Sequence, residues 1–394
     1  MFRKLLFLLD EEQKKSTIKI FIFLLVAMLL EVADIGIVIP MVGLVIDSDT
    51  ILIKKIFSTL SSFGITDYFD VVIFILFLFT LFFLIKSIFL TFVLWIQSKF
   101  IYNLKVSISD RLFKKYLSQK YSFHLNRNSA EFIRNINNEV DTLSGTINFL
   151  LTLVAETLIS FGILFLLIII EPVITITVIL LFGTAALLFY YLIRNKSLSW
   201  GLKRQAFDGK KIQQLQQAFG GIKEVKLRNK ETFFEHLYSK FNLGSSNMSR
   251  NQSFISTFPR YWLEFLVIVC FFLIVYILKV SGGTSASILP TLAIFGAAAF
   301  KVYPSTNKIL SSAQMVRYNL PVVNLIFSEM NLKNDNSKLP NENNLNKEIN
   351  FKNKISININ EFRYSKKTHK VLNKIKFEIL KGESIGIIGE SGAG

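Results

Sequence analysis

A glycine-rich segment near residue 390 could bind the phosphates of a nucleotide. Residues 384–388 are a short apolar run that predicts a buried strand, and GESGAG follows this run directly. These six residues match the first six positions of G-x-x-x-x-G-K-[ST], a loop whose backbone N–H groups surround phosphate oxygens. The residues that would form the loop are Gly389, Glu390, Ser391, Gly392, Ala393 and Gly394. Six residues alone are weak evidence, so a plain turn after a strand is the alternative interpretation.

The segment before this loop adds to the evidence for a nucleotide site. Residues 355–362 (ISININEF) alternate as a strand does, and a second strand is predicted over 371–379. A Lys-Gly-Glu turn then leads into the apolar run and the glycine loop. This order of motifs resembles the start of the nucleotide-binding domain of an ABC transporter. The resemblance implies that Tyr364 stacks on adenine, and that ATP and Mg²⁺ are the cofactors of the intact protein.

The printed sequence ends at Gly394, before the lysine that would contact the β- and γ-phosphates and the hydroxyl that would bind Mg²⁺. The Walker B acid and the signature loop of the family are absent as well. We therefore assign no catalytic residue. We expect this chain to be cut inside the motif, to lack ATPase activity and to bind no ATP or Mg²⁺ by itself.

The composition indicates a membrane protein. Hydrophobic residues make up 51% of the 394 residues, 39 are Phe, and the mean hydropathy is +0.45, which predicts several membrane spans. The net charge is +17, but the basic residues lie between apolar segments, as in cytoplasmic loops, so we expect no nucleic acid partner. Cys270 is the single cysteine and the three histidines are far apart, so the sequence predicts no disulfide framework and no metal site.

The apolar segments predict a mostly α-helical membrane protein with six transmembrane helices. The spans are expected at 18–46, 71–96, 145–170, 173–193, 261–280 and from 288 to about 302. Only Glu171 and Pro172 separate the third span from the fourth, which predicts a helical hairpin.

Four domains follow from these patterns. Residues 1–17 predict an amphipathic helix on the membrane surface, with a frayed soluble end as the alternative. The six-helix transmembrane domain covers 18–330, and its helical pattern continues beyond the last span. Residues 331–349 are rich in Asn and Lys and read as a linker. Residues 350–394 form the β-rich start of an α/β nucleotide-binding domain.

Two long polar segments, 97–141 and 194–260, hold many more Lys and Arg residues than the loops on the opposite side. The positive-inside rule therefore places both segments and the N-terminus in the cytoplasm of a multi-pass protein of the cell (inner or plasma) membrane. Both segments keep a helical pattern, so long cytoplasmic helical extensions are expected.

The resemblance gives these extensions a role. In six-span ABC exporters, short coupling helices join the extended helices and contact the ATP-binding domains. Residues 129–140 and 220–228 resemble these coupling regions. The resemblance also implies a half-transporter whose partner is a second half, most simply a second copy in a homodimer. Solvated helical hairpins with no partner are the alternative.

Charged residues inside the predicted spans need an explanation, because a charge at the bilayer centre costs ~2.5–3.5 kcal/mol on insertion scales. The residues concerned are Glu31, Asp34, Lys86 and Glu156. They could line a polar path for the head group of a substrate. Alternatively, Lys86 forms a structural ion pair with Asp34 or Glu31 and fixes the helix packing.

Two segments, LEVADIGIVIPMVGLVID and GGIKEVKLRNKETFF, are similar to bacterial ABC transporters that flip lipid-linked oligosaccharides or export polysaccharides. The implied function is ATP-driven flipping or export of a lipid-linked saccharide or a similar amphiphile. The alternatives are an exporter of peptides or drugs, and an inactive truncated membrane protein. An ion channel is a third alternative, which leaves the glycine loop unexplained.

Overall fold

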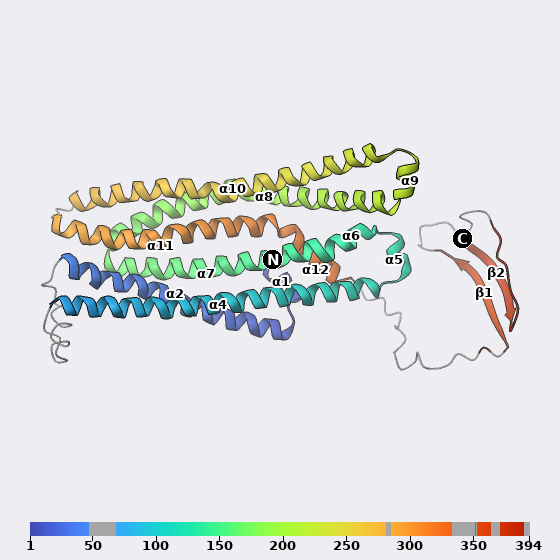
Figure 1. Cartoon of the computed structure of the whole chain (residues 1–394), viewed down its shortest axis with the longest axis horizontal. Helices are drawn as coiled ribbons and strands as arrows, with labels where there is room; N and C mark the ends of the chain where they lie inside the picture. The colour runs from blue at the N-terminus through green and yellow to red at the C-terminus, as the bar shows by residue number, and fades with distance from the viewer. Residues whose placement is uncertain (47–67, 281–284, 333–350, 352, 364–370, 390–394) are drawn as a thin grey trace.

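The computed structural model describes residues 1–46, 68–280, 285–332, 351, 353–363 and 371–389 (Figure 1). Helices dominate the described residues, and one two-stranded antiparallel sheet follows them in the chain. The helices are α1 (Phe2–Leu8), α2 (Glu11–Ile46), α4 (Tyr68–Leu117), α5 (Tyr121–Leu125), α6 (Ser129–Arg134), the π-helix η1 (Asn135–Glu139), α7 (Val140–Ile170), α8 (Pro172–Gly220), α9 (Ile222–Leu227), α10 (Glu231–Val280), α11 (Ser285–Tyr318) and α12 (Leu320–Met330).

Five helical stretches of the described residues are long and apolar enough to cross a membrane. They are Glu11–Ile37, Val72–Leu117, Ser129–Ile170, Pro172–Gly220 and Glu231–Val280. Five such stretches identify a multi-pass membrane protein. The predicted span from residue 288 falls in α11, which is not one of the five, so the count of six is not confirmed.

Three helices are far longer than a bilayer requires. Helices α4, α8 and α10 contain 50, 49 and 50 residues, or roughly 75 Å each at 1.5 Å per residue, whereas the hydrocarbon core is ~30 Å thick. The predicted helical extensions are therefore present. Figure 1 shows that α5, α6 and α9 lie at one end of the bundle, opposite the turn between α7 and α8. We call the end of the bundle that holds α5, α6 and α9 the α9 end.

The helix boundaries follow the breakers in the sequence. The α7–α8 hairpin is confirmed, because α7 ends at Ile170 and Pro172 begins α8, where a missing N–H costs nothing. Helix α8 ends at Gly220, and Gly221 precedes α9.

The N-terminal helix is shorter than the predicted 1–17. Helix α1 ends at Leu8 and α2 begins at Glu11. The Asp10 backbone N–H donates to Gln13 Oε1 at 2.9 Å, which is one half of a capping box. This local start signal divides the segment into two helices.

The helices enclose two apolar clusters. One includes Leu8, Leu104, Leu143 and Ile326, from α1, α4, α7 and α12. The other surrounds Ile163 and joins α2, α7, α8, α10 and α11. Figure 1 shows α8 and α10 side by side on one side of the bundle and α2 and α4 on the other, with α7 and α11 between them.

Strands β1 (Lys354–Phe362) and β2 (Leu372–Leu380) form the sheet, with Ile357 opposite Phe377. Both strands confirm the sequence pattern. The buried strand predicted over 384–388 is wrong: these residues have no regular secondary structure, and Ile387 and Ile388 are 88% and 98% exposed. An apolar run becomes a buried strand only when neighbours cover it, and no described strand pairs with this one.

Candidate functional site

Four charged side chains meet between α2, α4 and α11, inside the apolar bundle. Lys86 Nζ lies 3.0 Å from Glu31 Oε2 and 2.7 Å from Asp34 Oδ2. Lys301 Nζ lies 2.8 Å from the same Glu31 oxygen and 3.1 Å from the same Asp34 oxygen. We call these four residues the membrane charge cluster. Its two acids and two bases balance, so the cluster carries no net charge when all four are ionised.

The cluster is buried on one side and open on the other. Asp34 and Lys86 are each 4% exposed, whereas the side chain of Lys301 is 33% exposed. Lys86 also lies over the ring of Phe83, at 5.1 Å from the centroid. The structure therefore brings together Glu31, Asp34 and Lys86, three of the residues predicted to line a substrate path. Their geometry is that of the alternative interpretation, a structural ion pair. Their role as a substrate path stays a prediction.

Glu156, the fourth predicted path residue, lies apart from the cluster. Its Oε1 accepts a 2.6 Å hydrogen bond from Lys308 Nζ, and the Lys308 side chain is 57% exposed. Lys301 and Lys308 are seven residues apart, which places them on the same face of α11. We call them the α11 lysines. The sequence analysis did not assign either of them, although Lys301 lies inside the predicted sixth span.

A third charged group joins α10 to α11 on the surface. The Tyr303 hydroxyl donates to Glu264 Oε1 at 2.7 Å, and Arg260 Nε lies 3.4 Å from the same oxygen. The side chains of Arg260 and Glu264 are 60% and 48% exposed. Tyr303 follows Lys301 by two residues, so this group lies on a face of α11 different from that of the α11 lysines.

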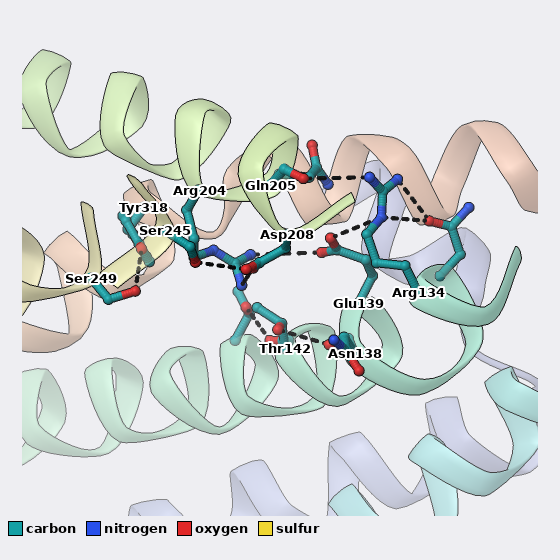
Figure 2. A network of polar contacts seen from close by, with 12 residues as sticks. Arg134, Asn138, Glu139, Thr142, Arg204, Gln205, Asp208, Ser245, Ser249 and Tyr318 are labelled. Atoms are coloured by element: carbon teal, nitrogen blue, oxygen red, sulfur yellow. Dashed lines mark hydrogen bonds and ion pairs between the residues drawn. The ribbon is translucent and has the colours of Figure 1, made fainter. Parts of the chain in front are cut away.

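A second buried network lies nearer the α9 end, beside α6 in Figure 1, and Figure 2 shows it from close by. Glu139 is 1% exposed and stands between two guanidinium groups, with Arg134 Nε at 3.5 Å and Arg204 Nη2 at 3.6 Å. Arg204 also reaches Asp208 Oδ2 at 3.3 Å. The Ser245 hydroxyl donates to Asp208 Oδ1 at 2.6 Å. These residues join α6 and η1 to α8 and α10.

This network anchors one of the two predicted coupling regions. Arg134 and Glu139 belong to residues 129–140, which form α6, η1 and the first residue of α7. The Glu139–Arg204 ion pair ties this region to α8, whereas the Arg134–Glu139 pair lies within it. The second predicted region, 220–228, contains α9, in which Leu227 is 73% exposed and Val225 is buried. An exposed apolar residue on a helical turn is available to a partner domain.

Arg127 connects the same end of the bundle to α12. Its Nη1 donates to both carboxylate oxygens of Glu329, at 3.0 and 2.8 Å, and Glu329 is 4% exposed. Partial burial by itself lowers the pKa of Arg127, but the hydrogen bonds and the charge of Glu329 more than offset it, and this pKa lies above its ordinary value. The Arg127 guanidinium therefore stays ionised, and its hydrogen bonds hold α12 against the α5–α6 connection.

Replacing Arg127 with methionine should loosen α12. Methionine keeps most of the apolar stem but leaves the buried Glu329 carboxylate without its donor, at a cost of about 1–3 kcal/mol. We expect faster hydrogen–deuterium exchange across residues 320–330 and a lower melting temperature. Lys105→Met is the matched control, because Lys105 pairs with Asp141 at 2.6 Å on the surface and such pairs contribute ~0–1 kcal/mol. Unchanged exchange in α12 would contradict the assignment.

The predicted nucleotide residues are for the most part outside the described residues. Tyr364, Glu390, Ser391, Gly392, Ala393 and Gly394 all lie there. Gly389 is described and exposed, at the end of the irregular segment. Nucleotide binding therefore stays a prediction. Within the part of the chain that the structure describes, no group of three His, Cys, Asp or Glu residues could hold a metal ion.

The sequence was compared with models of known protein families. Residues 37–297 match the model described as ABC transporter transmembrane region. The match covers more than half of the 394 residues. It begins within α2, ends within α11 and includes both predicted coupling regions.

Proposed function

The chain belongs to the family of ABC transporter transmembrane regions, and on this premise we propose that it flips or exports a lipid-linked saccharide or a similar amphiphile. The family establishes transport across a membrane. The substrate class is our inference from the charged groups at membrane depth.

The α11 lysines carry this proposal. Their side chains are 33% and 57% exposed, and their partners Glu31 and Glu156 lie near the middle of predicted spans. An ammonium group facing lipid at this depth would cost several kcal/mol. The exposed side of α11 therefore borders water or a polar ligand. The spans around this face present apolar side chains.

A polar face inside an apolar bundle suits an amphiphile. The head group needs hydrogen-bond donors and charges while it crosses, and its hydrocarbon tail can stay in the bilayer. Anionic head-group oxygens could compete with Glu31 and Glu156 for the lysine ammonium groups. A wholly apolar drug would have no use for these charges, so the arrangement favours the saccharide class.

The proposed orientation puts the α9 end in the cytoplasm. The connections at this end carry most of the loop Lys and Arg residues, which favours the cytoplasmic side. Residues 129–140 and 220–228 would there contact ATP-binding domains, and a second copy of the chain would complete a homodimer. ATP, bound together with Mg²⁺, would supply through its binding and hydrolysis the free energy for the conformational change. Residues 389–394 and Tyr364 are the part of this chain proposed to contact the nucleotide.

The test is transport by the protein, together with its complete ATP-binding domain, in proteoliposomes. A fluorescent lipid-linked oligosaccharide should cross the bilayer when ATP is present and remain in place when a non-hydrolysable analogue replaces ATP. A peptide and a cationic dye are tested in parallel. Movement of the peptide or the dye without movement of the saccharide would overturn the substrate class. Movement of none of the three would favour an inactive membrane protein.

A further inference from the structure

We propose that the apolar pocket between α1, α2, α4 and α7 binds an acyl chain of a membrane phospholipid. The pocket has a volume of about 180 Å³. Leu6, Phe21, Phe100 and Leu150 line it, one from each of the four helices. We call it the α1 pocket. It is separate from the membrane charge cluster, because its last α2 residue, Leu24, precedes Glu31 by about two turns.

The lining of the α1 pocket suits a hydrocarbon. Its side chains are aliphatic or aromatic with the exception of Thr17. The Thr17 hydroxyl already donates to the Gln13 carbonyl at 2.9 Å. A polar ligand would therefore lose its hydration and gain few hydrogen bonds. An enclosed apolar cavity of about 150 Å³ accepts a hydrocarbon of the size of benzene, so the open α1 pocket, at about 180 Å³, has room for a segment of an acyl chain.

The surroundings of the pocket indicate that the ligand comes from the bilayer. Leu6 and Phe21 are 51% and 46% exposed, so they contribute both to the pocket and to the outer surface. Ile18 and Ile22, which lie near Phe21 on α2, are 62% and 53% exposed. The pocket is therefore continuous with the surface that this membrane protein presents to lipid. The nearest abundant hydrocarbon is an acyl chain of the leaflet on which α1 lies.

A lipid in the pocket would contact α1 on one face, and α12 contacts α1 on another. Lys4 Nζ donates to Asn324 Oδ1 at 2.6 Å, and the rings of Phe7 and Phe327 meet at 5.3 Å, edge to face. Helix α12 precedes the chain that leads to β1. A lipid in the α1 pocket would thus contribute to the attachment of α12 as well as α1.

Photocrosslinking in lipid nanodiscs tests this proposal. The probe is a phosphatidylcholine with a diazirine at the end of one acyl chain, and the labelled peptides are identified by mass spectrometry. We expect label concentrated on the peptides that hold Leu6, Phe21 and Leu150. The variant Leu150→Trp fills the pocket and should reduce this label by about tenfold, one decade of affinity.

The control is Leu187→Trp, which adds the same bulk at a position on α8 that is 70% exposed and should leave the labelling unchanged. Monodispersity of each variant is checked before labelling. If Leu150→Trp does not fold, Val154→Phe, which fills the same pocket, takes its place and carries the same expectation. Label spread evenly over the exposed helices, or pocket label that a folded filling variant does not reduce, would overturn the proposal.

Discussion

Replacing Lys86 with methionine is expected to destabilise the protein strongly. Lys86 is 4% exposed and contacts Asp34 and Glu31 at 2.7 and 3.0 Å. Its loss leaves two carboxylates within reach of Lys301 alone. Breaking a buried ion pair by removal of one partner costs about 3–5 kcal/mol. The measurements are the folded yield and the melting temperature of the purified protein in detergent.

Three further variants, Lys308→Met, Asp34→Asn and a double variant, separate stability from transport. Lys308→Met removes an exposed lysine from the Glu156 pair and should cost much less, because the Lys308 side chain is 57% exposed. The double variant Lys86→Met with Asp34→Asn removes one charge of each sign, and the double-mutant cycle gives the coupling energy between them. A normal melting temperature for Lys86→Met would show that the cluster contributes little to stability. Low yield with normal specific transport activity would reject the cluster as a substrate path.

Replacing Gly201 with alanine is the second change for which we expect a large effect. Gly201 lies inside α8 at a point where a Cβ atom would lie 1.9 Å from the Tyr318 carbonyl oxygen and 2.9 Å from its carbon. These are backbone atoms, so a side-chain rotation cannot relieve the contact. Overpacking of this kind costs about 1–3 kcal/mol, and sometimes more. We expect a lower melting temperature, with α8 and the end of α11 moved apart.

Gly183→Ala is the matched control within the same helix. A Cβ at Gly183 would meet nothing within 4 Å, so this change should stabilise α8 by roughly 0.5–1 kcal/mol through helix propensity alone. The two variants make the same chemical change and are expected to act in opposite directions. If both raise the melting temperature, the close contact between α8 and Tyr318 is not present in the folded protein.

Local signals in the sequence account for most of the fold. The apolar runs predicted the positions of the long helices, and Pro172 marked where α8 begins. Alternation predicted both strands of the sheet. The prediction failed at 384–388 because an apolar run specifies a strand only together with its neighbours. It was also incomplete at residues 1–17, where a capping signal at Asp10 separates two helices.

The charged contacts were less predictable, because they depend on how distant helices rotate against each other. The sequence suggested Lys86 with Asp34 or Glu31, since all three had to be neutralised inside spans. It gave no reason to pair Lys308 with Glu156, which is 152 residues away. The contact between Glu139 and Arg204 was equally unpredictable, because each residue lies in a segment whose sequence is that of an ordinary solvated helix. Their partners are defined only by the packing of α6, η1 and α8.

The π-helical turn at Asn135–Glu139 changes the rotation of the preceding helix, α6, about the helix axis relative to α7. Each residue advances an α-helix by about 100°, so a turn that holds one extra residue rotates everything before it around the axis. Positions five apart diverge on an α-helix but stack on a π-helix, which brings Arg134 beside Glu139. The predicted coupling region 129–140 therefore begins with a helix, α6, whose rotation about the helix axis differs from that of α7. Deletion of one residue from η1 would rotate α6 about the helix axis and leave every residue of α7 in place.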